Sequence, residues 1–287
     1  MSRSVAVLCA GVAVLAAAHE LRHDFDVTVF ESSDRAGGHA HTVEVDDSGR
    51  RLGLDTAFIV FNEPNYPRLS RFFRELDVPM VPHKGGFLFF DLDGSLRYST
   101  EDLDIPEDEL RTRYSEQFQN ISREAKRFYE QAPRDFVRGR ADVPLGEYLD
   151  REGYSDDFKY GFIVLQASAV WSAPAEMIWD IPAATIIGYF WSHGHGGLGG
   201  RNVDWHTVHN GSQTYVATVL AELDAAGAKV HTSTPVSAVR VGADDVEVHA
   251  DGAVQRFDQV VVATHADQAR ELVDGLPGGR DPFLAQR

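Results

Sequence analysis

Gly11 and Glu31 have the residue types and the spacing that dinucleotide binding requires. A glycine lets a turn approach a pyrophosphate, and a carboxylate about 20 positions later accepts hydrogen bonds from a ribose. Here the separation is 20 positions, and Glu31 directly follows residues 26–30, whose alternating pattern predicts a strand. The chemistry indicated is nucleotide binding at the ends of two neighbouring parallel strands.

The turn around Gly11 departs from the usual G-x-G-x-x-G pattern, because Cys9 and Val14 replace its first and third glycines. Cys9 would have to form the turn without the freedom of glycine at positive φ, which costs about 1 kcal/mol or more. Val14 brings a β-branched side chain to the place where helix and strand should pack. The glycine nearest the phosphate remains. We expect Cys9 to be a small buried hydrophobe rather than a reactive thiol.

Residues 5–21 also fit a secretion signal, since Arg3 precedes an apolar run that ends in the small residues 16–18. A signal peptide makes no demand on the sequence that follows, whereas a nucleotide-binding turn requires the strand and the acid that Glu31 provides. We therefore favour a strand, a turn and a helix. A secreted binding protein with a cleaved leader is the weaker alternative. The elements that must position the site are then residues 5–8, 9–14 and 15–21.

Composition narrows the function classes. A chain of 287 residues with 43% hydrophobic residues can form one large or two ordinary domains. The formal charge of -17 argues against a nucleic-acid partner, which needs a basic surface. One cysteine excludes an internal disulfide, and no later segment approaches the roughly 18 apolar residues that span a bilayer. We expect a cytoplasmic protein with no transmembrane segment and no nucleic-acid partner.

Histidine pairs suggest a metal site only weakly. His39 and His41 form one pair, and His193 and His195 form another, but neither has a cysteine partner or the HExxH spacing. Residues 192–200 (SHGHGGLGG) are better interpreted as a glycine-rich loop. A G-x-S-x-G motif is also missing, so acyl transfer lacks its nucleophile. The sequence predicts no metal centre.

Two further segments carry a family resemblance: RAGGH at residues 35–39, after Glu31, and LDTAFIVFNEPNYP at residues 54–67. Together they resemble the flavin-containing amine oxidase superfamily, which includes amine oxidases, phytoene-type desaturases and protoporphyrinogen oxidases. The second segment is similar to a bacterial group of amine-oxidase-like NAD/FAD-binding proteins. The resemblance covers nearly the whole chain. It implies an α/β fold: a Rossmann-like FAD-binding domain of the glutathione-reductase-like type, with an inserted, mainly helical substrate domain.

The resemblance also assigns an FAD site. The pyrophosphate would meet backbone N–H groups at the start of the first helix, and Glu31 would hold the adenosine ribose. The RAGGH loop would approach the pyrophosphate, residues 57 and 58 would pass the isoalloxazine ring, and the backbone of residue 236 would contact the adenine. No catalytic residue is assigned. The implied cofactor-binding residues are Gly11, Val12, Ala13, Glu31, Arg35, Gly37, Gly38, His39, Ala57, Phe58 and Val236.

The domain organisation follows from the same resemblance and from the hydrophobic periodicity. Residues 1–95 and 205–287 would form the FAD-binding domain, and residues 96–204 the helical substrate domain. Helices are predicted at residues 66–76, at 107–131 and after residue 145. Ser212 is a candidate N-cap for another helix, and three strand-like runs follow that helix. The low charge density of residues 162–187 suits a hydrophobic or lipid-like substrate.

The function implied is that of an FAD-dependent oxidoreductase, which moves a hydride from a C–N or C–C bond to the flavin. A degenerate scaffold or subunit that has lost FAD is the alternative. Members of the superfamily are longer than this chain, so a partner chain could complete the FAD-binding domain.

Overall fold

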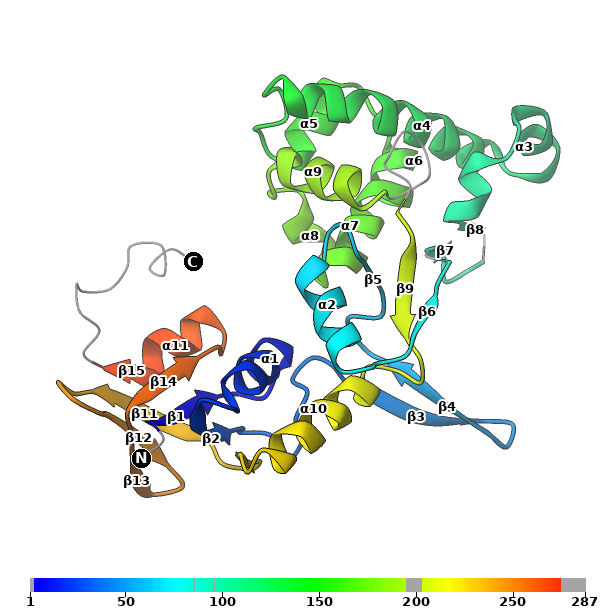
Figure 1. Cartoon of the computed structure of the whole chain (residues 1–287). Helices are drawn as coiled ribbons and strands as arrows, with labels where there is room; N and C mark the ends of the chain where they lie inside the picture. The colour runs from blue at the N-terminus through cyan, green and yellow to red at the C-terminus, as the bar shows by residue number, and fades with distance from the viewer. Residues whose placement is uncertain (1–2, 85, 95, 195–202, 275–287) are drawn as a thin grey trace. The chain divides into compact units, whose positions relative to one another are not determined.

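The computed structural model describes residues 3–84, 86–94, 96–194 and 203–274 and divides into two compact units (Figure 1). Unit 1 comprises Met1–Phe61, Tyr66–Pro82 and His206–Arg287. Unit 2 comprises Asn62–Asn65 and His83–Trp205. The structure is mixed α/β, as the sequence predicts.

A four-stranded parallel sheet lies at the centre of unit 1. Its strand order is β10 (Lys229–His231), β2 (Phe25–Phe30), β1 (Arg3–Leu8) and β14 (Gln259–Val262). The register pairs Leu8 with both Phe30 and Val262, so the carboxyl ends of three strands lie level with one another. Polar groups that follow these strands are therefore brought to the same edge of the sheet.

Alternation along β1 explains how the two faces of this sheet are covered. Val5 and Val7 pack into a core with α1 (Val12–Leu21) and α10 (Gln213–Ala225). Ala6 and Leu8 face the other way, into a core with a second sheet. Both faces of the parallel sheet are thus buried, as such sheets require. The second sheet has the order β13 (Ala253–Phe257), β12 (Val246–Ala250), β11 (Val236–Val241) and β15 (Val273–Asp274).

Residues 5–21 form β1, a turn and α1, which confirms the strand–turn–helix interpretation. The helix begins at Val12, earlier than the predicted start at residue 15. Val14 is fully buried in the core that α1 shares with α10, so the β-branched side chain is accommodated there.

The remaining elements of unit 1 include a hairpin of β3 (Thr42–Asp47) and β4 (Arg50–Asp55). The predicted helix at residues 66–76 is α2 (Pro67–Glu75), and α11 (Ala266–Leu272) follows β14. Three short strands form a further sheet in the order β5 (Phe61–Asn62), β9 (Trp205–Val208) and β6 (Met80–Pro82), of which Asn62 and Trp205 belong to unit 2.

Unit 2 is mainly helical. The helix predicted at residues 107–131 is in fact two, because Tyr114 is extended and the Ser115 hydroxyl caps a new helix by accepting from the N–H of Phe118. The helices are α3 (Glu107–Arg113), α4 (Glu116–Val137), α5 (Leu145–Arg151), α6 (Asp156–Phe158), α7 (Val164–Trp171), α8 (Ala175–Ile178) and α9 (Ala183–His193). A 3-10 turn (Thr100–Asp104), a π-helical turn (Lys159–Ile163) and a hairpin of β7 (Leu88–Phe90) and β8 (Arg97–Ser99) complete the unit.

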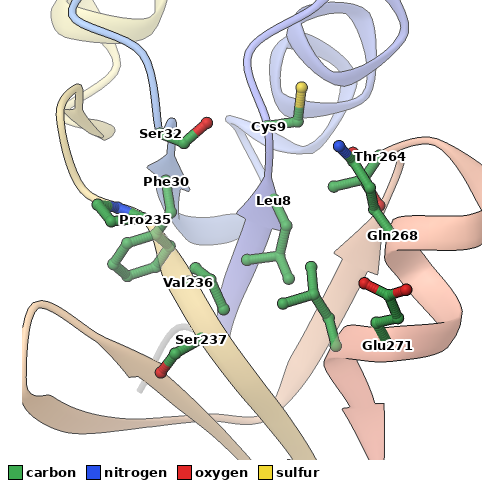
Figure 2. A pocket seen from close by; sticks show the side chains of 11 residues that line it. Leu8, Cys9, Phe30, Ser32, Pro235, Val236, Ser237, Thr264, Gln268 and Glu271 are labelled. Carbon is green, nitrogen blue, oxygen red and sulfur yellow. The ribbon is translucent and has the colours of Figure 1, made fainter.

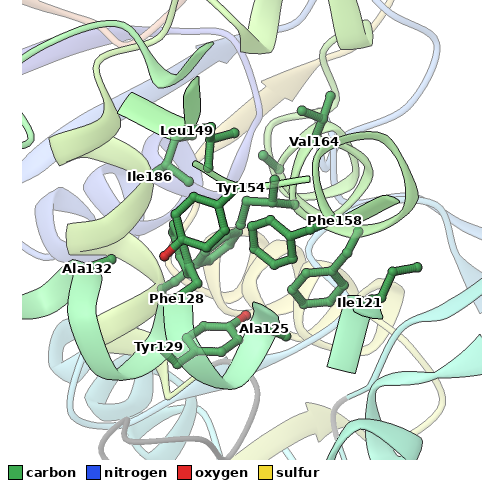
Figure 3. Close-up of a cluster of buried hydrophobic side chains, with 14 of the residues drawn as sticks. Ile121, Ala125, Phe128, Tyr129, Ala132, Leu149, Tyr154, Phe158, Val164 and Ile186 are labelled. Carbon is green, nitrogen blue, oxygen red and sulfur yellow. The ribbon is translucent and has the colours of Figure 1, made fainter. Parts of the chain in front are cut away.

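An aromatic core holds the helices of unit 2 together. Figure 3 shows Phe128, Tyr154 and Phe158 in contact, with Ile121 and Leu149 around them. Phe128 and Phe158 are at most 1% exposed, and burial of such side chains contributes about 1.5–3 kcal/mol each. Among the described helices of either unit, none is long and apolar enough to cross a membrane.

Candidate nucleotide-binding site

The turn between β1 and α1 holds Cys9 in the left-handed region, at φ 86°. Its backbone N–H donates to the Phe30 carbonyl at 2.8 Å, which fixes the turn against the end of β2. A non-glycine residue with this φ is strained by about 1–2 kcal/mol. Burial raises the pKa of the Cys9 thiol, and the charge of Glu31 adds to that rise, so the thiol stays neutral.

Gly11 is the N-cap residue of α1 and has an ordinary φ of -71°. A Cβ atom at Gly11 would meet no protein atom within 4 Å. The packing of the protein therefore does not require glycine here, whereas close approach of a ligand would. No side chain caps α1, so the N–H groups of Val12 and Ala13 at its start can face an anion.

The RAGGH loop lies directly against this turn. The Gly37 N–H donates to the Ala10 carbonyl at 2.8 Å, and a Cβ on Gly38 would lie 2.9 Å from the Gly11 Cα. Both glycines of the loop have a positive φ, 117° at Gly37 and 59° at Gly38. The glycine pair is therefore more than a simple turn, because only glycine permits this approach to Gly11.

Arg35 stabilises the shape of the same loop. Its guanidinium donates to the carbonyl oxygens of Gly38 at 2.9 Å and Ala40 at 3.2 Å. The structure thus places Arg35, Gly37, Gly38 and Gly11 together, but two of the hydrogen bonds of Arg35 are made within its own loop.

Glu31 is a buried carboxylate, 4% exposed, between the two loops. Its Oε2 accepts from the N–H of Ala10 at 2.6 Å and its Oε1 from the N–H of Ser33 at 2.8 Å. Burial alone would raise the pKa of Glu31, but the hydrogen bonds from Ser33 and Ala10 outweigh it and lower the pKa. The group is ionised, and it also accepts from the Ser32 hydroxyl at 3.3 Å and from the Cys9 thiol.

The exposed rings of His39, His265 and Phe58 lie near one another at the end of the RAGGH loop. The ring centroids of His39 and His265 are 5.5 Å apart, and those of His39 and Phe58 are 6.3 Å apart. Phe58 is 71% exposed and has a φ of 53°, while Ala57 beside it is half-buried. Sequence reasoning missed His265, because nothing in the sequence shows that β14 ends beside the RAGGH loop.

Asp55 forms a different kind of site, at the start of α10. Its carboxylate accepts from the Ser212 N–H at 2.9 Å, the Ser212 hydroxyl at 2.8 Å and the Thr42 hydroxyl at 2.5 Å. Ser212 does occupy the N-cap position, but its side chain caps nothing; it donates to Asp55 instead, which corrects the role expected of it. Gly211 is required here, since a Cβ would lie 2.7 Å from the Thr42 hydroxyl oxygen.

Comparison with known proteins now identifies the family. The family model for flavin-containing amine oxidoreductases matches residues 15–285, which is nearly the whole chain. This chain belongs to the flavin-containing amine oxidoreductase family. No curated protein sequence matches it.

Several solved structures share the fold of this amine oxidoreductase family member. A putrescine oxidase with bound putrescine has 19% identity and a TM-score of 0.65, and the match covers 96% of this chain and 61% of that one. An oxidoreductase from Methanosarcina mazei has 15% identity and a TM-score of 0.60, covering 94% and 61%. A CLA-producing fatty acid isomerase from P. acnes has 17% identity and a TM-score of 0.57, covering 96% and 62%. The chain spans about three fifths of the length of these relatives.

A cavity of about 400 Å³ lies beside the carboxyl ends of β1 and β2 in this family member (Figure 2). Val236, at the start of β11, lines it, and so do Cys9 and Ser32. Gln268 and Glu271 of α11 line the opposite side. Nothing in the sequence marks α11 as part of a site, because the two residues are ordinary polar positions on a helix.

Of the two histidine pairs, His39 and His41 lie wholly in the described part of the chain. There, no group of three or more His, Cys, Asp or Glu side chains gathers in a way that could hold an ion. His195 and most of the predicted glycine-rich loop lie outside the described residues, at 195–202.

Proposed function

We propose that this chain binds FAD and belongs to an FAD-dependent oxidoreductase. Unit 1 would be a Rossmann-like FAD-binding domain of the glutathione-reductase-like type, and unit 2 the inserted substrate domain. The observation that carries the proposal is Gly11: the protein leaves the space above it empty, although the RAGGH loop packs against its other side. A close ligand would use the open space, and the RAGGH loop would fix the position of Gly11 beside it.

The residues present fit the dinucleotide. Gly11 and the N–H groups of Val12 and Ala13 would hold the pyrophosphate at a helix N-terminus. Glu31 would accept from the ribose hydroxyls, and His39 would lie near the pyrophosphate as the basic residue of its loop. The position of Ala57 and the exposed ring of Phe58 suit the flavin end. Once bound, FAD would supply the hydride acceptor for oxidation of a C–N or C–C bond.

The substrate that we propose is hydrophobic and lipid-like: an apolar chain with one reacting bond. Unit 2 supports this choice because Tyr160, Leu165 and Met177 are 61%, 43% and 60% exposed. The ring of Tyr160 also contacts Trp179, with centroids 5.2 Å apart. One structural relative is a fatty acid isomerase, which is consistent with an apolar substrate for this fold.

We also propose that a further polypeptide segment, from a partner chain or a longer form of this protein, completes unit 1. The relatives are longer, and β14 pairs with β1 alone among the described strands of its sheet. Val260, Val261 and Val262 of β14 are only half-buried at that edge. A fifth parallel strand would cover them.

The test is the visible absorption spectrum of the purified chain, before and after incubation with FAD and desalting. The expected result is a retained flavin spectrum that Glu31→Ala loses and the surface control Glu44→Ala keeps. A colourless protein that takes up no FAD would contradict the proposal and favour the scaffold alternative.

The hydrophobic substrate is tested in a separate experiment on the protein with FAD bound. Without oxygen, long-chain amines or unsaturated lipids should bleach the flavin, because hydride transfer reduces it. Bleaching by small polar amines alone would reject the hydrophobic substrate while leaving FAD binding intact.

A further inference from the structure

The cavity of unit 1 is a slot between two chemically different walls. Figure 2 shows Phe30 and Val236 on one side, Gln268 and Glu271 on the other, and Leu8 between them. Its volume of about 400 Å³ falls in the range that small-molecule sites occupy. The slot therefore has room for a nucleobase with part of its sugar.

The inner surface of the slot suits the face of a flat ring. Leu8 and Phe30 are 1% and 2% exposed and form a fixed apolar floor. Val236 and Leu272 add apolar surface at the two sides. A purine base is apolar on its faces and polar along its edge, so its orientation would be decided by the polar groups at the rim.

Two of those polar groups come from α11. Gln268 and Glu271 are three positions apart on the helix, so they share one face of it. Both side chains are exposed, and neither makes a hydrogen bond or an ion pair with another described residue. They are therefore available to a ligand in the slot.

The chemistry of these two groups selects one kind of base edge. An ionised carboxylate only accepts hydrogen bonds, so Glu271 requires a donor opposite it. An amide can donate and accept together, which is how Gln recognises adenine. A 6-aminopurine supplies an exocyclic N–H donor at C6, whereas a 6-oxopurine carries its N–H at N1 and would turn an oxygen lone pair toward a carboxylate that lies opposite C6.

We infer that α11 selects a 6-aminopurine in this slot, with Glu271 accepting from the exocyclic amine and Gln268 contacting the adjoining edge. This inference rests on the proposed function, because the base would be the adenine end of the dinucleotide. It adds a base-selecting role for α11 to the contacts already assigned to Glu31 and Val236.

The test compares ADP with inosine diphosphate (IDP), which differ in the group at C6 and in the proton on N1, by titration calorimetry on the whole chain. The wild-type chain should bind ADP at least roughly tenfold more tightly than IDP. Glu271→Gln should bring the two affinities to within about threefold of each other, since an amide can also donate to the C6 oxygen. Gln268→Ala should weaken ADP by roughly threefold to tenfold.

Glu44→Gln is the matched control, because it removes the same charge from the β3–β4 hairpin, away from the slot. It should leave the ADP-to-IDP ratio unchanged. Equal wild-type affinities for ADP and IDP, or a ratio that survives Glu271→Gln, would overturn this inference and leave the proposed function standing. A wild-type chain that binds neither nucleotide would overturn both. Equal wild-type affinities would overturn the inference without any variant, and Gln268→Ala gives a second, separate test of α11 if Glu271→Gln fails to fold.

Discussion

Two helices of unit 1 begin beside a glycine, and the two glycines have opposite surroundings. At α10, the space beside Gly211 is filled by Thr42 and Asp55, and Asp55 accepts the N–H of Ser212. At α1, the space above Gly11 is empty, and no side chain caps the helix. The first helix start is completed by the protein itself. The second is open, and we propose that the dinucleotide binds there.

The two carboxylates near these turns differ in the same way. Asp55 accepts hydrogen bonds from the Thr42 hydroxyl and from the N–H and hydroxyl of Ser212, all at the start of α10. Glu31 joins two loops that both border the candidate site. Variants at each turn should therefore separate loss of folding from loss of binding.

The stability of unit 1 needs its own probe. All four tryptophans lie in unit 2, so hydrogen exchange on peptides from β1 and β2 is a better probe of the unfolding of unit 1 than tryptophan fluorescence.

The largest effect is expected from Gly211→Ala. The new Cβ would lie 2.7 Å from the Thr42 hydroxyl oxygen at a φ of 87°, so both a clash and a strained backbone result. We expect unit 1 to lose roughly 3 kcal/mol or more of its free energy of unfolding. Gly227→Ala, at the other end of α10 with a φ of 80° and open space, should cost only about 1 kcal/mol. Both variants are compared in urea titrations followed by hydrogen exchange. Equal losses of stability for Gly211→Ala and Gly227→Ala would show that Thr42 and Asp55 are not closely packed around Gly211.

Asp55→Ala should come next. The change removes the acceptor of the Ser212 N–H, and Ser212 is 2% exposed, so a buried donor loses its partner. A loss of about 2 kcal/mol is expected in the same titrations. Asp26→Ala, at an exposed position of β2, provides the comparison and should stay within roughly 0.5 kcal/mol of the wild type. The structural role of Asp55 would be rejected if both variants were equally stable.

Glu31→Gln should produce a smaller change that depends on pH. The pKa of Glu31 is lowered in the folded protein, so its charge stabilises the fold above the unfolded-state pKa, near 4.5. That contribution is lost as the pH falls through the folded-state pKa. The gap in urea midpoint between wild type and variant should therefore be full at pH 7 and shrink below about pH 4.5. A gap that is constant down to pH 3 would contradict the hydrogen-bonded carboxylate.

Cys9→Gly should have the smallest effect and the opposite sign. Glycine adopts a φ of 86° without strain, so relief of about 1 kcal/mol should slightly exceed the cost of the lost side chain. The urea midpoint of unit 1 should stay the same or rise. A clear fall would mean that the packing of the Cys9 side chain matters more than the geometry of the turn.

The local part of the site was predictable from the sequence, and the long-range part was not. Residues 5–8, the 26–30 strand and Glu31 form a βαβ pattern that spacing alone predicts, and the positive φ of Cys9 follows from its place in the fingerprint. The contact of Ser212 with Asp55 spans 157 positions, and no local pattern records such a pairing. The same holds for His265 beside His39 and for α11 at the cavity, since both depend on where β14 ends.

In unit 2 the helical periodicity was correct, but one boundary was missed. The apolar spacing of residues 107–131 continues across Tyr114 and Ser115, so periodicity predicted one helix where there are two. The signal for the break was the capping serine, whose preference for helix N-termini competes with continuation.

The most direct test of the account is the affinity of Gly11→Ala for FAD, measured by quenching of flavin fluorescence alongside the urea stability of the same variant. The account predicts a folded protein within about 1 kcal/mol of the wild type, because the new Cβ meets no protein atom within 4 Å. It also predicts an FAD affinity at least roughly tenfold weaker, since the methyl group would occupy the space kept for the pyrophosphate. Wild-type FAD affinity in a folded Gly11→Ala protein would contradict the central claim that this turn is held open for a dinucleotide.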